Sequence, residues 1–282
     1  MLRVKIFFVM ILFLVLATFR VEAATDWNNL TVTTTAIGVA PEEFHGLKAK
    51  VIAKRTALVI AYRQLAEIIN GVHVNSETTI ENMTLTSDII RTRIDTVIKG
   101  AQIISERELE GNGCEITLQL PMFSASGGLA EAVIERPAEI IPFPEPAISI
   151  ESKSGGASNY TVIEGGENSP MKAIGNYTGL IVDCRGMNLN PVMSPVIKNS
   201  SGTKLYGHEN LNYDLVVSEG MASYADDISQ TSRAGNNPLI IKAQTLADNN
   251  SNPVVAIDDG NRILIENGKT GFLNDTAVVF LK

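Results

Sequence analysis

The stretch 124–176 places the strongest limit on how this chain can fold. It begins Ser-Ala-Ser-Gly-Gly, carries four prolines between positions 137 and 146, and contains glycine pairs at 155–156 and 165–166. Such a proline run favours extended polyproline conformation, and about 50 irregular residues are unusual inside one compact domain. The sequence therefore predicts two domains joined by a Pro/Gly/Ser-rich linker at 124–176, in which one short helix is expected at 129–135.

The first 24 residues have the pattern of a secretory signal peptide. Two basic residues precede an apolar run over 6–19, and Ala23 and Ala24 supply small residues for a peptidase. The run has about 14 residues, which is short for a helix that must cross a ~30 Å hydrocarbon core. We expect cleavage after Ala23 or Ala24 and a location in the periplasm or cell envelope. The alternative is an uncleaved anchor.

Net charge and hydropathy exclude several kinds of partner. The formal charge is −8, and removal of a signal with three basic residues and one acidic residue makes the mature protein about −10. An acidic protein is poorly suited to nucleic acid or to anionic lipid. Beyond the signal no apolar stretch reaches the ~18 residues of a transmembrane helix. We therefore expect neither a nucleic-acid partner nor a transmembrane segment after cleavage.

The two cysteines, Cys114 and Cys184, do not indicate a lipid anchor. A bacterial lipoprotein needs cysteine as its first mature residue, and neither cysteine lies near the cleavage site. Each alternates with apolar neighbours and resembles a small inward-facing residue on its own strand. An oxidising compartment would permit a disulfide between them, so pairing stays open at this point.

The N-terminal half predicts a compact α+β domain over residues 28–123. Threonine and β-branched residues favour a strand at 30–39, and acidic residues after Pro41 favour a helix from 41 to 70. Ser87 is a candidate N-cap for a second helix that ends at Gly100. The turn Glu110-Gly111-Asn112-Gly113 is expected to join strands at 101–108 and 114–120 into a hairpin.

The predicted 41–70 helix has two contrasting sets of side chains. Its apolar residues recur at three-, four- and seven-residue spacings and predict one buried stripe: Phe44, Leu47, Val51, Leu58, Tyr62, Leu65 and Ile69. Its basic residues are Lys48, Lys50, Lys54, Arg55 and Arg63. These five form either an ordinary solvated face or an interaction site for an acidic neighbour, which would be a second copy or another protein.

The C-terminal part, residues 177–282, predicts a second α+β domain that is richer in strands. Apolar runs favour strands at 180–184, 193–197, 204–207, 215–217, 239–243, 253–257 and 277–281. Short helices are expected at 221–228 and 259–267. The predicted fold class is thus α+β, with two small domains after a cleaved signal peptide.

No catalytic, cofactor or metal site is evident in the sequence. The three histidines, His45, His73 and His208, are far apart and none has a partner at metal-ligand spacing. The run Asp258-Asp259-Gly260-Asn261 resembles part of a calcium loop, but position twelve of such a loop is Lys269, so a turn or helix start explains it better. We therefore expect a protein that is not an enzyme.

The residues from Gly46 to Glu67 resemble the basic, alanine-rich helix of the LPP-twenty family of bacterial envelope lipoproteins. The N-terminal domain of the flagellar T-ring protein is similar to that family. The continuation Ile69-Asn70-Gly71-Val72-His73-Val74, and Gly100-Ala101 followed by the hairpin, fit the same pattern over roughly 38–123. The resemblance implies an envelope location and, in flagellar members, ring-like assembly around a larger machine. This chain departs from the lipoprotein pattern because it lacks the cysteine that is acylated in those proteins.

A second resemblance covers Tyr177 to Lys282. The segments at 178–186, 191–195, 206–207 and 237–243 are similar to a region found downstream of this domain in exported bacterial proteins, for which no chemistry is assigned. Together these patterns predict an exported, non-enzymatic envelope protein with an assembly or structural role, associated with flagellar or other surface machinery. The alternative is a periplasmic binding module for a small molecule or cell-wall fragment.

Overall fold

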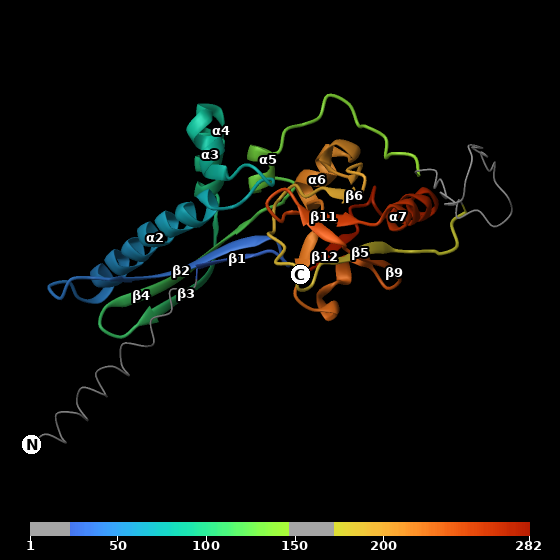
Figure 1. Ribbon diagram of the computed structural model, residues 1–282. Helices are drawn as coiled ribbons and strands as arrows, with labels where there is room; N and C mark the ends of the chain where they lie inside the picture. Colours follow the sequence, from blue (N-terminus) through green and yellow to red (C-terminus); the bar gives the residue numbers. More distant parts are fainter. Residues whose placement is uncertain (1–22, 147–171) are drawn as a thin grey trace, which may run out of the picture. The chain divides into compact units, whose positions relative to one another are not determined.

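The computed structural model describes residues 23–146 and 172–282, and it has an α+β fold. Most of the predicted signal peptide lies outside this part, and the expected cleavage site falls at the start of strand β1. The described chain divides into two compact units (Figure 1). Unit 1 comprises residues 23–25, Val32–Ile68 and Ala101–Leu120. Unit 2 comprises Asp26–Thr31, Ile69–Gly100 and, among later residues, those described from Pro121 to Lys282.

Unit 1 is a four-stranded sheet with one long helix along one face (Figure 1). The strand order is β1-β2-β4-β3. The elements are β1 (Ala23–Asp26), β2 (Thr31–Val39), α2 (Gly46–Asn70), β3 (Gln102–Leu109) and β4 (Gly113–Pro121). Alternate residues of β2 and β4 are buried, as period-two strands with one covered face should be.

The buried face of α2 is mostly alanine, and the predicted stripe is only partly right. Leu65 and Ile69 are buried as expected, but Leu47 and Val51 are 77% and 58% exposed. The buried residues repeat every four positions: Ala49, Ala53, Ala57 and Ala61. They allow a close approach to Gly38 on β2, where an added Cβ would lie 2.3 Å from the Ala53 oxygen and the Ala57 nitrogen.

The hairpin of unit 1 is as predicted, whereas the helix starts later. Gly111 and Asn112 have φ of +71° and +57°, which the turn between β3 and β4 needs. Helix α2 begins at Gly46 rather than Pro41, so no acidic residue lies in its first turn. Gly46 has φ of +58°, a left-handed conformation that separates the preceding loop from the helix.

Unit 2 contains five α-helices and two further four-stranded sheets within the described residues. The helices are α3 (Ile80–Thr86), α4 (Asp88–Lys99), α5 (Leu129–Val133), α6 (Tyr213–Glu219) and α7 (Ile257–Thr270). The strands are β5 (Gly179–Asp183), β6 (Ile197–Asn199), β7 (Lys204–Tyr206), β8 (Ser223–Ala225), β9 (Pro238–Lys242), β10 (Thr245–Ala247), β11 (Asn252–Val255) and β12 (Val278–Leu281). Three short 3-10 turns lie at His208–Asn210 (η1), Ile228–Gln230 (η2) and Ser232–Ala234 (η3).

The two sheets of unit 2 differ in strand direction. One has the order β8-β12-β5-β9, and all its neighbouring strands are parallel. The other has the order β10-β11-β6-β7, with one parallel pair between two antiparallel ones. Strands β5 and β12 are buried along nearly their whole length, as strands at the centre of a parallel sheet should be.

Three sequence predictions in unit 2 have the wrong secondary structure. The expected strand at 193–197 shares only its last residue with β6, which runs over Ile197–Asn199. The expected strand at 215–217 is part of helix α6, because the Asn212 side chain caps the helix by accepting from the Asp214 and Leu215 amides. The expected helix at 221–228 contains strand β8, which pairs with β12. By contrast, Ser87 caps α4 and α4 stops at Gly100, as predicted.

The compact units do not follow the predicted domain boundaries of 28–123 and 177–282. Residues 69–100 group with the C-terminal residues, because their backbone bonds directly to the segment before β6. The Met193 and Ser194 amides donate to the His73 and Val74 carbonyls, at 3.0 and 2.8 Å. A sequence split into consecutive domains cannot anticipate this return of the chain.

The predicted linker at 124–176 is too long at both ends, while 147–171 lie outside the described residues. Near its start the Ser124 amide donates to the Val217 carbonyl, and α5 buries Leu129, Ala130, Ala132 and Val133. Near its end the Ile174 and Gly175 amides donate to the carboxylate of Glu266, whose side chain is fully buried and also pairs with Arg262. Both ends therefore pack as parts of unit 2.

Cys114 and Cys184 are free, buried thiols. Cys114 lies on the covered face of β4, and Cys184 directly follows β5, so both positions fit the predicted inward-facing residues. Cys114 belongs to unit 1 and Cys184 to unit 2. Burial raises the pKa of both thiols, to about 12 for Cys184.

We expect Gly38→Ala to destabilise unit 1 by roughly 1–3 kcal/mol, because its methyl group would collide with the α2 backbone. Urea denaturation followed by circular dichroism measures the change. The matched control is Gly268→Ala in α7, where nothing lies within 4 Å of an added Cβ. A Gly38→Ala protein as stable as wild type would contradict the close approach.

We expect Cys184 to resist thiol reagents in the folded protein and to react fully after denaturation. Because its pKa rises from 9.0 to about 12 on folding, its contribution to stability is intact below pH 9 and is lost as the pH rises toward 12. Reagent titration of the Cys114→Ala variant isolates this thiol. Rapid labelling of folded Cys114→Ala protein would show that the Cys184 site opens.

Candidate functional site

The five basic residues predicted to form an interaction site lie on α2, and most have partners within unit 1. Lys50 and Lys54 pair with Glu108 and Glu106 of β3, at 2.7 and 2.8 Å. Arg63 pairs with Glu67 one turn along the helix at 3.4 Å, and the Lys48 ammonium lies 4.5 Å from the centre of the Phe44 ring. Arg55 is exposed. The acidic neighbour of Lys50 and Lys54 is thus in the same chain.

The sheet of unit 1 has open hydrogen-bonding edges on both sides. Strand β3 pairs with β4 only, and all its residues but Leu109 are exposed. On the other side β1 has four residues against nine in β2, so at least five β2 residues have no described strand on the side away from β4. Open edges present unpaired amides and carbonyls to other chains.

The two open edges differ in charge and both carry apolar residues. Strand β3 has Ile103 and Ile104, 45% and 51% exposed, followed by Glu106-Arg107-Glu108. Strand β2 has no charged residue and ends at Val39, which is 56% exposed. Charged side chains on one half of β3 disfavour pairing with a strand of another molecule. The other half of β3 and the end of β2 carry no charge that would disfavour it.

Helix α2 extends the apolar surface beside β3. The Lys50–Glu108 and Lys54–Glu106 pairs show that four helix residues, about 6 Å, match two strand residues. Continuing this spacing brings Leu58 level with the β-bulge between Ile103 and Ser105, which contains Ile104. The neighbouring Val59 is 64% exposed. We call Leu58, Val59, Ile103 and Ile104 the apolar seam.

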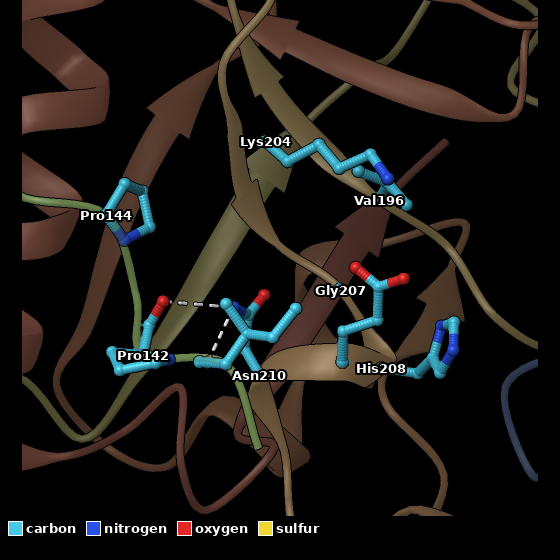
Figure 2. Close-up of a pocket in the computed structure, with 9 residues that line it drawn as sticks. Pro142, Pro144, Val196, Lys204, Gly207, His208 and Asn210 are labelled. Carbon is cyan, nitrogen blue, oxygen red and sulfur yellow. Dashed lines mark hydrogen bonds between the residues drawn. The ribbon is translucent and has the colours of Figure 1, made fainter. Parts of the chain in front are cut away.

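Unit 2 has a hollow of about 230 Å³ between its proline-rich segment and the β6–β7 hairpin (Figure 2). Figure 2 shows Pro142 and Pro144 on one side and Val196, Lys204 and His208 on the other. The remaining lining residues are Ile141, Gly207, Glu209 and Asn210. The sequence pattern does not reveal this hollow, because the prolines of residues 141–144 are typical of a linker.

The segment 141–144, which we call the strap, is fixed to η1 and β7. The Ile141 amide donates to the Glu209 carbonyl at 2.8 Å, and the Asn210 side-chain amide donates to the Ile141 and Pro142 carbonyls (Figure 2). The Phe143 ring stacks on Tyr206, with centroids 6.5 Å apart. Tyr206 is fully buried and donates its hydroxyl to the Met221 carbonyl, so the wall of the hollow rests on a rigid anchor.

The structure does not bring the three histidines together, and each lies in a different environment. His208 borders the hollow, and its Nδ1 lies 3.3 Å from the Ser194 hydroxyl. His73 is an exposed residue that bridges to Thr79, and His45 is exposed ahead of α2. In the described part of the chain no three His, Cys, Asp or Glu residues are placed to hold a metal ion.

The carboxyl edge of the parallel sheet carries charges that pair with one another. This edge is where ligands bind in many α/β proteins. Here Asp183 pairs with Arg185 at 2.7 Å, and Asp226 pairs with Lys282 at 2.6 Å. The Arg185 guanidinium holds the pKa of Asp183 below its usual value. These groups satisfy each other, so the hollow beside the strap is the better candidate for a ligand.

Comparison with known proteins places a family match in the C-terminal part of the chain. Residues 179–282 match a family described as the second domain of Treponema pallidum Tp0624. No protein of curated function matches the chain. Within residues 23–146 and 172–282, no helix is both long and apolar enough to cross a bilayer. The C-terminal part of unit 2, from β5 to β12, is therefore similar to the second domain of Tp0624.

Proposed function

We propose that this is an exported, non-enzymatic protein of the cell envelope that works by assembling with other copies of itself. The observation that carries the proposal is the sheet of unit 1, in which no described strand pairs with the outer edge of either β1 or β3. The predicted cleavage after Ala23 or Ala24 would shorten β1 and expose still more of β2. The resemblance to envelope proteins supports the proposed location. It also supports an association with flagellar or other surface machinery.

Charge favours a head-to-tail contact, in which β3 of one copy pairs with β2 of the next. Two β3 strands pairing with each other would bring Glu106 and Glu108 of both copies together, and like charges across a strand pair are destabilising. Strand β2 has no charge to oppose them. A contact between unlike edges leaves one free edge of each kind, so the same contact can repeat from copy to copy. Such repetition produces rings or filaments.

The apolar seam would add side-chain contact to the backbone pairing. Strand addition draws affinity from main-chain hydrogen bonds and specificity from the side chains beside them. Ile103 and Ile104 lie on the strand that would be paired, and Val59 lies on the adjacent helix. Val39 at the end of β2 is the matching exposed apolar residue on the other edge.

We expect the mature protein to self-associate, and either Ile104→Lys or Val39→Lys alone to make it monomeric. Each lysine disables one of the two unlike edges. Mixing the two variants should restore a dimer, because the intact β2 of one meets the intact β3 of the other. Light scattering after size exclusion measures the mass of each sample.

The matched control is Ile228→Lys on η2, which is 50% exposed and lies in unit 2. It should assemble like the wild type. A wild-type protein that stays monomeric at its highest soluble concentration would contradict self-assembly. If Val39→Lys left the association intact while Ile104→Lys abolished it, the contact would be between like edges instead.

A further inference from the structure

The hollow in unit 2 is lined by two opposite charges, Lys204 and Glu209. The Lys204 charge helps to lower the pKa of Asp248, but no described residue forms an ion pair with either side chain. Neither side chain forms a hydrogen bond within the described residues. Most other charges of unit 2 near a strand end are paired, as at Asp183 and Asp226. Lys204 and Glu209 are therefore free to interact with a ligand.

Beside these charges and the polar side chains of His208 and Asn210, the hollow has an apolar wall that is held in place. Ile141, Pro142, Pro144 and Val196 supply hydrocarbon surface. The backbone bonds of the strap to η1 and the Phe143–Tyr206 stack fix this surface without a ligand. A preformed wall lowers the ordering cost of binding.

Size and charge together restrict the ligand. A hollow of about 230 Å³ is smaller than the ~300–1,000 Å³ of sites for drug-sized molecules. A simple anion would be repelled by Glu209, and a simple cation by Lys204. A molecule that carries both charges and a short apolar group satisfies all of the lining.

We infer that the hollow binds a small zwitterion of the amino-acid class with an apolar side chain. Its carboxylate pairs with Lys204, its ammonium group pairs with Glu209, and its side chain lies against Pro142 and Pro144. Free amino acids and short peptides share this chemistry. The site lies within unit 2 and does not depend on the proposed assembly through unit 1.

Isothermal titration calorimetry of the mature protein with leucine tests the inference. We expect leucine to bind at least tenfold more tightly than N-acetyl-leucine, which lacks the ammonium charge, or leucinamide, which lacks the carboxylate. A leucyl-leucine titration distinguishes the source: tighter binding of the dipeptide assigns the site to peptides, and tighter binding of leucine assigns it to free amino acids.

Two variants test which residue recognises each charged group of the ligand. Lys204→Met keeps the apolar stem and should bind leucine no better than leucinamide, and Glu209→Gln should bind leucine no better than N-acetyl-leucine. Lys242→Met and Glu135→Gln, at exposed positions outside the hollow, should retain both preferences. Failure of leucine and leucyl-leucine to bind, or unchanged preferences in Lys204→Met and Glu209→Gln, would overturn the inference.

Discussion

The close approach of α2 to the sheet at Gly38 determines what the surface of unit 1 looks like. Only alanines fit between the helix and the β2 backbone at this distance, so Ala49, Ala53 and Ala57 face inward. Several larger apolar residues of the same helix consequently turn outward, whereas Leu65 and Ile69 are buried. Leu47, Val51 and Val59 are exposed not because the helix lacks a core but because that core has no room for them. The apolar seam is a consequence of this packing.

In unit 2 charges that are buried or half-buried hold together segments that are distant in sequence. The Glu266 carboxylate receives the Ile174 and Gly175 amides just before the chain enters β5. The half-buried Arg233 guanidinium donates to the carbonyls of Glu219, Gly220 and Thr276. It thereby satisfies the end of α6 and the turn before β12 at once. Removing either group would leave several backbone polar atoms without a partner, so these contacts hold the segments that lead into β5 and β12.

Local rules predicted the local structure well and the packing poorly. The turn around Gly111, the Ser87 cap and the alternation along β4 depend on neighbouring residues, and all three agree with the structure. The buried face of α2 depends on the distance to β2, which periodicity does not contain, so alanines were overlooked beside larger apolar residues. The hollow could not be predicted from the sequence for a related reason. Its wall depends on backbone bonds between the strap and Glu209, which no side-chain pattern encodes.

The basic residues of α2 are better understood through the strand they touch than through a distant partner. Lys50 and Lys54 form exposed ion pairs, which contribute little to stability, typically ~0–1 kcal/mol. Their geometric effect is larger, because they draw Glu108 and Glu106 over the helix. Arg107, which lies between the two glutamates on β3, pairs instead with Glu115 of β4. The charged half of β3 is therefore tied by ion pairs to α2 and β4, whereas its apolar half, Ile103 and Ile104, is exposed without such contacts.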